Sequence, residues 1–351
     1  MAAMTSLREP YDDVVDGNVL PKIIELGPTL YGMAFQLMKL LPARFILRRA
    51  LERGELEPGV TVAETTSGTF GLGLAIECRL RGHPLILVGD PAIDGPLRRR
   101  MEALGARVSI VSASALRGRD VQRARLERLA YFQSRLPRYF TPCQYDNLDN
   151  PASYGVVAEL LLETLGQVDA LVCPVGSGGS SSGMGSFLRA VLPELRLIGV
   201  DTPGSVLFAA PAGPRLLRGL GNGLLPQALD HRLFDEVHWI AAPDAFAATR
   251  AMHADQCLFM GPTSGAAYHV AAWYAWTHPG ERVVATFPDE GHRYAGTVYN
   301  DAWLRRHSLL REPARAPRTV DHPAEVAGPW TRFAWNRRSR EQVLRLRGGA
   351  A

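Results

Sequence analysis

Residues 176–183, with the sequence GSGGSSSG, lie between two apolar segments of the chain. Gly176, Gly178 and Gly179 permit tight backbone turns that bring several N–H groups to one point. Ser177 and Ser180 add hydroxyl donors, and a helix beginning here would add the positive end of its dipole. This combination predicts a loop that binds a phosphate group.

Other interpretations of this loop agree less well with the sequence. A Walker loop needs a lysine that is absent here, and the dinucleotide motif GxGxxG fails because Ser181 stands in place of the third glycine. A flexible glycine–serine linker is the remaining alternative, but linkers do not join an apolar strand to an apolar helix. A phosphate loop without a nucleotide motif favours a phosphorylated cofactor or a sugar phosphate.

The second chemical candidate is an amine. Lysine occurs only at Lys22 and Lys39, and every other basic residue is arginine. Arginine cannot lose its proton near neutral pH, whereas a desolvated lysine can. A position that keeps lysine in a sequence so rich in arginine is therefore a candidate for amine chemistry. The alternative for either lysine is a solvated surface residue.

Alternating strands and helices would position these groups. Apolar strands are expected at residues 60–65, 84–90 and 107–111, and again at 170–175 and 195–201, with helical segments between them. This alternation predicts parallel sheets with crossover helices, in two blocks that meet near residues 145–151. The loops would then lie at the carboxyl ends of strands, where α/β folds bind ligands.

The composition, 46% apolar and 21% charged, is ordinary for a soluble globular protein. No segment is long and apolar enough to span a membrane, the acidic start lacks the order of a secretory signal, and the histidines show no metal-ligand spacing. An arginine- and proline-rich tail would pack on the body of the protein or on a partner subunit; binding of nucleic acid is the alternative. Reduced thiols in a cytoplasmic protein are predicted from the scattered cysteines Cys78, Cys143, Cys173 and Cys257.

Seven segments follow one another in a fixed order within residues 36–303. They are ETTSGTFGLGLA (64–75), MEALGARV (101–108), QYDNLDNP (144–151), VGSGGSSSGMGSFLRAVLPELRLIGVD (175–201), GLGNGLLP (219–226), GPTSGAA (261–267) and FPDEGHRY (287–294). Together they resemble the cysteine synthase and cystathionine β-synthase family of fold type II pyridoxal-phosphate (PLP) enzymes. The ending RYAGTVYNDAW resembles a branch that includes diaminopropionate-forming synthases.

The resemblance implies a two-lobed α/β fold of the tryptophan synthase β type, with parallel-rich sheets, flanking helices and an active-site cleft between the lobes. Residues 62–147 would form a smaller, mobile lobe. Residues 1–61 and 148–303 would form the larger, cofactor-binding lobe, and residues 304–351 a C-terminal extension. A homodimer that acts on a small amino acid, without nucleic acid or membrane, is the expected assembly.

The resemblance also implies roles for individual residues. Lys39 would carry PLP as a Schiff base and act as the catalytic base. The phosphate would be held by Gly176, Ser177, Gly178, Gly179 and Ser180, and the pyridine nitrogen would face Thr263. The substrate would be held by Thr66, Ser67, Gly68, Thr69, Gln144, Gly219 and Gly221, with Thr69 also next to the cofactor ring. For Ser67 and Thr69 the alternative is a helix N-cap.

The implied reaction is β-elimination from a serine derivative, such as O-acetylserine or O-phosphoserine, to an α-aminoacrylate, followed by β-replacement. The resemblance would make the protein a lyase or transferase of amino-acid biosynthesis. A hydroxyl partner such as Thr263 supports this outcome, because it would not keep the pyridine nitrogen protonated. The alternatives are an elimination-only dehydratase or deaminase of the same fold and a catalytically weakened binding or regulatory homologue.

Two departures from the family pattern lie close to these residues. The usual NPGGS before the lysine is replaced by GMAFQLM, and the usual asparagine of the TSG loop is replaced by Thr69, followed by Phe70. Both changes surround the substrate and one face of the ring. They put the primary substrate in question and favour a role in specialised metabolism.

Overall fold

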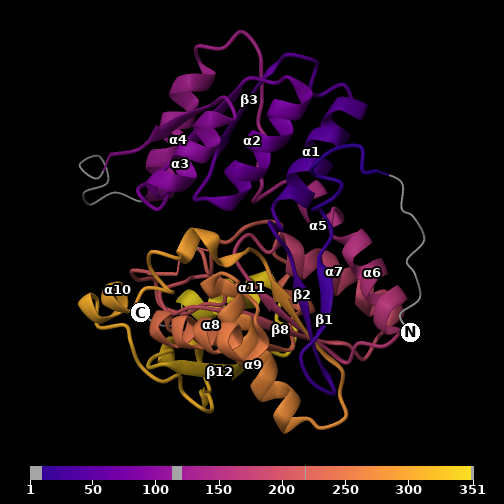
Figure 1. Ribbon diagram of the computed structural model, residues 1–351, viewed down its shortest axis with the longest axis vertical. Helices are drawn as coiled ribbons and strands as arrows, with labels where there is room; N and C mark the ends of the chain where they lie inside the picture. Colours follow the sequence, from indigo (N-terminus) through magenta and orange to yellow (C-terminus); the bar gives the residue numbers. More distant parts are fainter. Residues whose placement is uncertain (1–9, 113–120, 218, 349–351) are drawn as a thin grey trace.

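The computed structural model describes residues 10–112, 121–217 and 219–348, and it shows two α/β lobes stacked one above the other (Figure 1). The smaller lobe is built on four parallel strands in the order β5–β4–β3–β6. Its strands are β3 (Thr61–Thr65), β4 (Leu85–Gly89), β5 (Ala106–Ile110) and β6 (Tyr139–Phe140), and its helices are α1 (Leu40–Glu52), α2 (Thr69–Arg81), α3 (Gly95–Ala103) and α4 (Val121–Gln133).

Alternate residues of β4 show how this sheet is covered. Leu85 and Leu87 belong to a hydrophobic cluster with α1, α2 and α3, whereas Ile86 and Val88 pack in a cluster with α4. Successive side chains of a strand point to opposite faces, so helices bury both faces of the small sheet.

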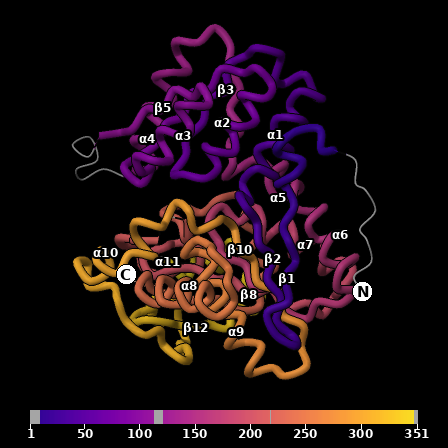
Figure 2. Tube along the Cα trace, viewed as in Figure 1, coloured from indigo at the N-terminus to yellow at the C-terminus, as the bar shows by residue number. Residues whose placement is uncertain are grey.

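The larger lobe contains an eight-stranded sheet in the order β1–β2–β10–β7–β8–β9–β12–β11. The pairs from β2 to β9 are parallel, whereas β1 pairs with β2, and β12 with β9, in the antiparallel sense. Figure 2 shows β2 beside β10, although the two strands lie far apart in the sequence. The strands are β1 (Lys22–Glu25), β2 (Leu30–Ala34), β7 (Ala170–Pro174), β8 (Arg196–Asp201), β9 (Glu236–Ile240), β10 (Val283–Phe287), β11 (Arg318–Thr319) and β12 (Trp330–Ala334).

Helices bury both faces of this sheet as well. Leu171 and Cys173 of β7 pack with one set of helices, and Ala170 and Val172 pack with the other. The first set includes α6 (Gly155–Leu165) and α7 (Gly179–Val191), and the second includes α8 (Ala242–Gln256) and α9 (Pro262–Thr277). The remaining helices are α5 (Asp149–Ala152), α10 (Asp301–Arg306) and α11 (Arg340–Gly348).

The expected α/β fold with parallel-rich sheets is therefore confirmed, and two details extend it. Helix α1, within residues 1–61, packs in the hydrophobic cluster of the smaller sheet. The C-terminal extension, for which the sequence indicates no strands, contributes β11 and β12 to the larger sheet. No helix in the described part of the chain is long and apolar enough to cross a membrane.

A buried polar network anchors β12 to β9. The indole Nε1 of Trp330 donates to Nδ1 of His238 at 2.8 Å, and Nε2 of His238 lies 2.5 Å from Oε1 of Glu236. Because Nδ1 accepts, the ring of His238 carries its proton on Nε2 and donates it to Glu236. Arg332 of β12 adds an ion pair of 2.6 Å to Glu236.

We expect Trp330→Phe to lower the free energy of unfolding by about 1–3 kcal/mol, because Nδ1 of buried His238 loses its donor. Urea denaturation of the purified protein measures this change. Trp276→Phe is the control, because that indole is 79% exposed. Equal stability of the two variants would show that the bond contributes nothing.

Candidate active site

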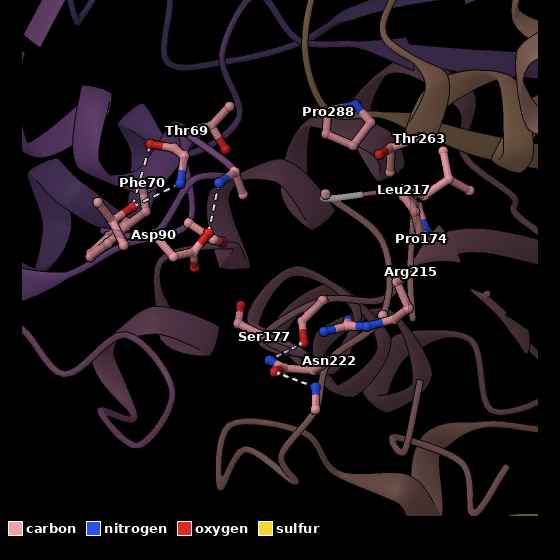
Figure 3. Close-up of a pocket in the computed structure, with 18 of the residues that line it drawn as sticks. Thr69, Phe70, Asp90, Pro174, Ser177, Arg215, Leu217, Asn222, Thr263 and Pro288 are labelled. Carbon is pink, nitrogen blue, oxygen red and sulfur yellow. Dashed lines mark hydrogen bonds between the residues drawn. The ribbon is translucent and has the colours of Figure 1, made fainter. Parts of the chain in front are cut away.

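A cavity of about 470 Å³ lies between the two lobes. Its walls come from segments that follow strand ends: residues 66–70 after β3, Asp90 after β4, residues 176–180 after β7 and Pro288 after β10. Figure 3 shows Thr69, Phe70 and Asp90 on one side and Ser177, Asn222, Thr263 and Pro288 on the other. The carboxyl ends of both sheets thus face one space, as the sequence predicts.

Lys39 lies in this wall, at the N-cap of α1. Its Nζ is 3.4 Å from Oγ of Ser177, in the loop proposed to bind phosphate. Burial disfavours the ammonium form and lowers the pKa of Lys39 to about 8. Lys22, in contrast, is exposed on β1. The structure therefore places one of the two lysines where an amine can react.

The turn that carries Lys39 is held from two sides. The backbone N–H groups of Phe35 and Met38 donate to the carbonyls of Phe287 (3.0 Å) and Pro288 (2.8 Å) at the end of β10. On the other side, a Cβ on Gly73 of α2 would lie 2.7 Å from the carbonyl oxygen of Lys39. Only glycine allows α2 to approach the lysine so closely, so Gly73 belongs to the architecture of the site.

The glycine loop forms a cradle at the N-terminus of α7. Gly178 has φ = 83°, a conformation that favours glycine, and a Cβ there would lie 2.5 Å from Leu229. A Cβ on Gly179 would lie 2.3 Å from Oδ1 of Asn150, a buried atom without a hydrogen-bond partner among the described residues. Gly176, Ser177 and Ser180 line the cavity, whereas Gly178 and Gly179 shape the turn behind it. These features fit a bound phosphate.

The loop after β3 opens toward the same cavity. The hydroxyl of Thr66 accepts hydrogen bonds from the N–H groups of Gly68 and Gly71, both at 3.1 Å, so this side chain shapes the loop. Ser67 and Thr69 remain partly exposed on the cavity wall. The N-cap of α2 is Gly68, and no side chain caps the helix. The alternative interpretation of Ser67 and Thr69 as N-caps is therefore wrong.

Gln144 lies deep in the cavity wall, and its backbone is fixed. Its N–H donates to Oε2 of Glu64 at 3.3 Å, and its carbonyl accepts from Nδ2 of Asn150 at 2.6 Å. Burial raises the pKa of Glu64 to about 7, although backbone N–H donors oppose this shift. Through Asn150, which also borders Gly179, Gln144 is linked to the cradle.

The far wall is formed by Thr263 and the segment around Gly219 and Gly221. A Cβ on Gly219 would lie 2.8 Å from Oγ1 of Thr263, in the first turn of α9. Gly221 has φ = 73°, and a Cβ there would lie 2.8 Å from Oδ1 of buried Asp201. The two glycines leave room beside the threonine hydroxyl that, by the family resemblance, would face the pyridine nitrogen.

Several charged residues of the cavity were missed by sequence reasoning. The guanidinium of Arg125 is almost completely buried, with Nη1 at 3.2 Å from Oδ2 of Asp90. Asp289 accepts a hydrogen bond of 2.8 Å from the hydroxyl of Tyr294, and burial raises the pKa of this carboxyl to about 6. The missed charged residues are Asp90, Arg125 and Arg215, whereas Asp289 and Arg293 belong to the segment 288–294 that the family resemblance places beside the cofactor ring, with a helix cap as the alternative for Asp289. Among the missed residues, only Asp90 carried a signal, because it is the last residue of a predicted strand.

A buried amine beside a glycine cradle, in a cleft between two α/β lobes, defines the site of a PLP-dependent enzyme. Residues 38–289 match the family described as pyridoxal-phosphate dependent enzymes, and the chain belongs to this family. It is an enzyme of the cysteine synthase type, with PLP as its cofactor. The expected family, cofactor and enzyme class are confirmed.

The similar proteins support this assignment. The N-(2-amino-2-carboxyethyl)-L-glutamate synthase of Cupriavidus metallidurans is 34% identical over 276 residues, which cover 77% of this chain and 81% of that protein. A putative cysteine synthase of Sinorhizobium fredii is 33% identical over 285 residues, or 80% and 84% of the two chains. A hydrogen sulfide-producing enzyme of Fusobacterium nucleatum has a solved structure with a TM-score of 0.76 and 26% identity, covering 81% of this chain and 100% of that one.

Lys39→Ala is expected to abolish borohydride-dependent fixation of PLP, whereas Lys22→Ala should leave it unchanged. With a pKa of about 8, roughly a tenth of the Lys39 amines are neutral at pH 7, and the neutral fraction rises as the pH increases through 8. The initial rate of fixation to the apoprotein should rise over the same interval. Mass spectrometry of tryptic peptides identifies the labelled lysine, and a label on Lys22 would contradict the assignment.

Gly179→Ala should weaken PLP binding by about tenfold, because the methyl group displaces Asn150 and distorts the cradle. Titration of the apoprotein, followed by the visible absorbance of bound PLP, measures the affinity. Gly296→Ala is the control, because a Cβ at that position meets no atom within 4 Å. Unchanged affinity in the Gly179 variant would argue against phosphate binding in this loop.

Proposed function

We propose that the protein replaces the β-substituent of a serine-derived amino acid, such as O-acetylserine or O-phosphoserine, with a nucleophile. The observation that carries this proposal is the position of the Lys39 amine, 3.4 Å from Ser177 and in one cavity with the loop after β3. Cofactor cradle, amine and amino-acid site would then surround a single α-carbon. PLP, when bound, supplies the electron sink that acidifies the α-proton.

Lys39 would serve two purposes. Its amine would hold the cofactor aldehyde and, after release, would take the α-proton of the substrate. A pKa of about 8 suits both tasks, because the amine is neutral often enough to react and basic enough to accept a proton. Gly176–Ser180 of the cradle would hold the phosphate through N–H groups and hydroxyls, and the hydroxyl of Thr263 would face the pyridine nitrogen.

The loop after β3 would orient the donor. The N-terminus of α2 lies at Gly68; the N–H of Gly71 donates to Thr66, whereas those of Thr69 and Phe70 have no acceptor within the helix and suit a carboxylate. Ser67, Thr69 and Gln144 line the same space and would add hydrogen bonds. The hydroxyl of Thr66 is engaged within the loop, so we propose that its contribution is to hold the N–H groups in place.

The charges of the cavity favour anionic substrates. Among the described lining residues, the cationic side chains Lys39, Arg125, Arg215 and Arg293 outnumber the carboxylates Asp90 and Asp289. Figure 3 shows the side chain of Arg215 extending into the cavity. A phosphorylated donor, or a nucleophile that carries carboxylates, would be attracted to such a site. The name of the Cupriavidus relative describes a 2-amino-2-carboxyethyl group on the nitrogen of glutamate. Glutamate is a nucleophile that carries carboxylates.

The assembly and location are proposed as well. A homodimer is the state that the family resemblance implies, and light scattering of the purified protein tests it. The cysteines Cys78, Cys143, Cys173 and Cys257 are free in the structure, which agrees with a reducing, cytoplasmic environment.

Incubation of the holoenzyme with O-acetylserine or O-phosphoserine, each with sulfide or glutamate, tests the function. We expect a β-substituted alanine as the main product, and none with Lys39→Ala. Mass spectrometry identifies the product. Pyruvate and ammonia alone would indicate the elimination-only alternative, and an absence of turnover with every donor would favour a binding or regulatory homologue.

A further inference from the structure

Arg293, which lines the cavity, joins the two lobes. It lies in a short 3-10 turn of the larger lobe, Gly291–Tyr294, and its Nε donates to Oδ2 of Asp94 in the smaller lobe at 2.7 Å. Its Nη2 also donates to the carbonyl of Ala92 at 3.3 Å. The Arg293 side chain is only 20% exposed and that of Asp94 38% exposed, so solvent weakens this ion pair only in part.

The same guanidinium borders the loop proposed to hold the substrate carboxylate. A Cβ on Gly68 would lie 3.1 Å from Nη1 of Arg293, so the arginine packs directly against the backbone of this loop. The positive charge is therefore close to the N-terminus of α2, where the donor carboxylate would bind.

On its other side, Arg293 is connected to the turn of Lys39. The residues that precede the 3-10 turn pair with those that precede the lysine: Leu37 forms a bridge with Asp289, and the N–H of Glu290 donates to the carbonyl of Gln36 at 3.3 Å. Tyr294, next to Arg293, donates to the carboxyl of Asp289. A continuous set of contacts thus runs from the reactive amine to the carboxylate loop through Arg293.

We propose that Arg293 is a positioning residue that holds the carboxylate-binding loop of the smaller lobe, through Gly68 and Asp94, where the donor can bind in the cavity. This inference rests on the proposed function for its substrate, but the contact itself does not. Loss of the contact would let the carboxylate loop move relative to the larger lobe, while the cofactor cradle, which lies entirely in the larger lobe, stays intact.

Asp94 offers a clean separation of two roles. Its Oδ1 accepts from the N–H of Leu97 and caps α3, whereas its Oδ2 binds Arg293. Asparagine caps helices as well as aspartate does, so Asp94→Asn keeps the cap and removes the charge opposite the arginine. The effect of this variant therefore reports the contact between the lobes and not the stability of α3.

We expect Arg293→Ala to raise the KM for the donor by about tenfold, with a smaller change in kcat and unchanged PLP absorbance. Asp94→Asn should raise KM by about threefold, and the double variant should be no worse than Arg293→Ala alone. Arg293→Lys should recover part of the loss, because lysine can reach Asp94 but cannot also donate to Ala92 in the same geometry. High salt should raise KM in the wild type more than in Asp94→Asn.

Arg250→Ala is the matched control. Arg250 also pairs with an aspartate at 2.7 Å and donates to a carbonyl at 3.3 Å, but Asp301 and Val298 belong to the same lobe as Arg250. Its donor KM should equal that of the wild type. Equal KM values in Arg293→Ala and the wild type, or a loss of PLP binding in Arg293→Ala, would overturn the proposal.

Hydrogen–deuterium exchange of the holoenzyme without substrate separates this inference from the proposed function. Amides of residues 66–70 and 91–97 should exchange faster in Arg293→Ala and Asp94→Asn than in the wild type, but not in Arg250→Ala. If no donor is turned over, the proposed function fails while this measurement still decides the role of Arg293. Unchanged exchange in both variants would refute the inference.

Discussion

The removal of the Lys39 amine from water is the physical condition on which the site depends. An exposed lysine would be almost fully protonated at neutral pH and could neither attack an aldehyde nor accept a proton. Burial lowers the pKa of Lys39 to about 8, and its Nζ atom lies 3.4 Å from a serine hydroxyl. The hydrogen bonds between residues 35–38 and β10 keep the amine in this environment.

Close backbone contacts at glycine bring the elements that surround the site together. Gly73 brings α2 against the turn of the lysine, and Gly179 brings α7 against Asn150. At each position a single methyl group would overlap with a backbone or amide atom. The geometry of the site thus depends on the missing side chains of these glycines as much as on its polar groups. Because the surrounding core is closely packed, neighbouring residues have little freedom to move aside for an added methyl group.

Much of the fold was predictable, because strand–helix alternation and the order of seven local motifs are visible in the chain. The fold class, family and cofactor are confirmed on that basis. The partner of a side chain far away in the sequence was not predictable: Arg293 contacts Asp94 across 199 positions, and β12 pairs with β9 although no local pattern indicates it. Thr66 illustrates a subtler limit, since the family resemblance implied substrate contact and only the loop geometry shows that its hydroxyl is already engaged.

The pairing of β12 with β9 bears on how the chain assembles. Strand β9 spans residues 236–240, whereas β12 lies at residues 330–334, so a ribosome completes the central parallel strands well before their last antiparallel neighbour. Until then β9 presents a row of unsatisfied backbone groups to any other strand in the cell. Strand β12 covers an edge of β9 that would otherwise be open, so the larger sheet is complete only once the C-terminal region has been synthesised.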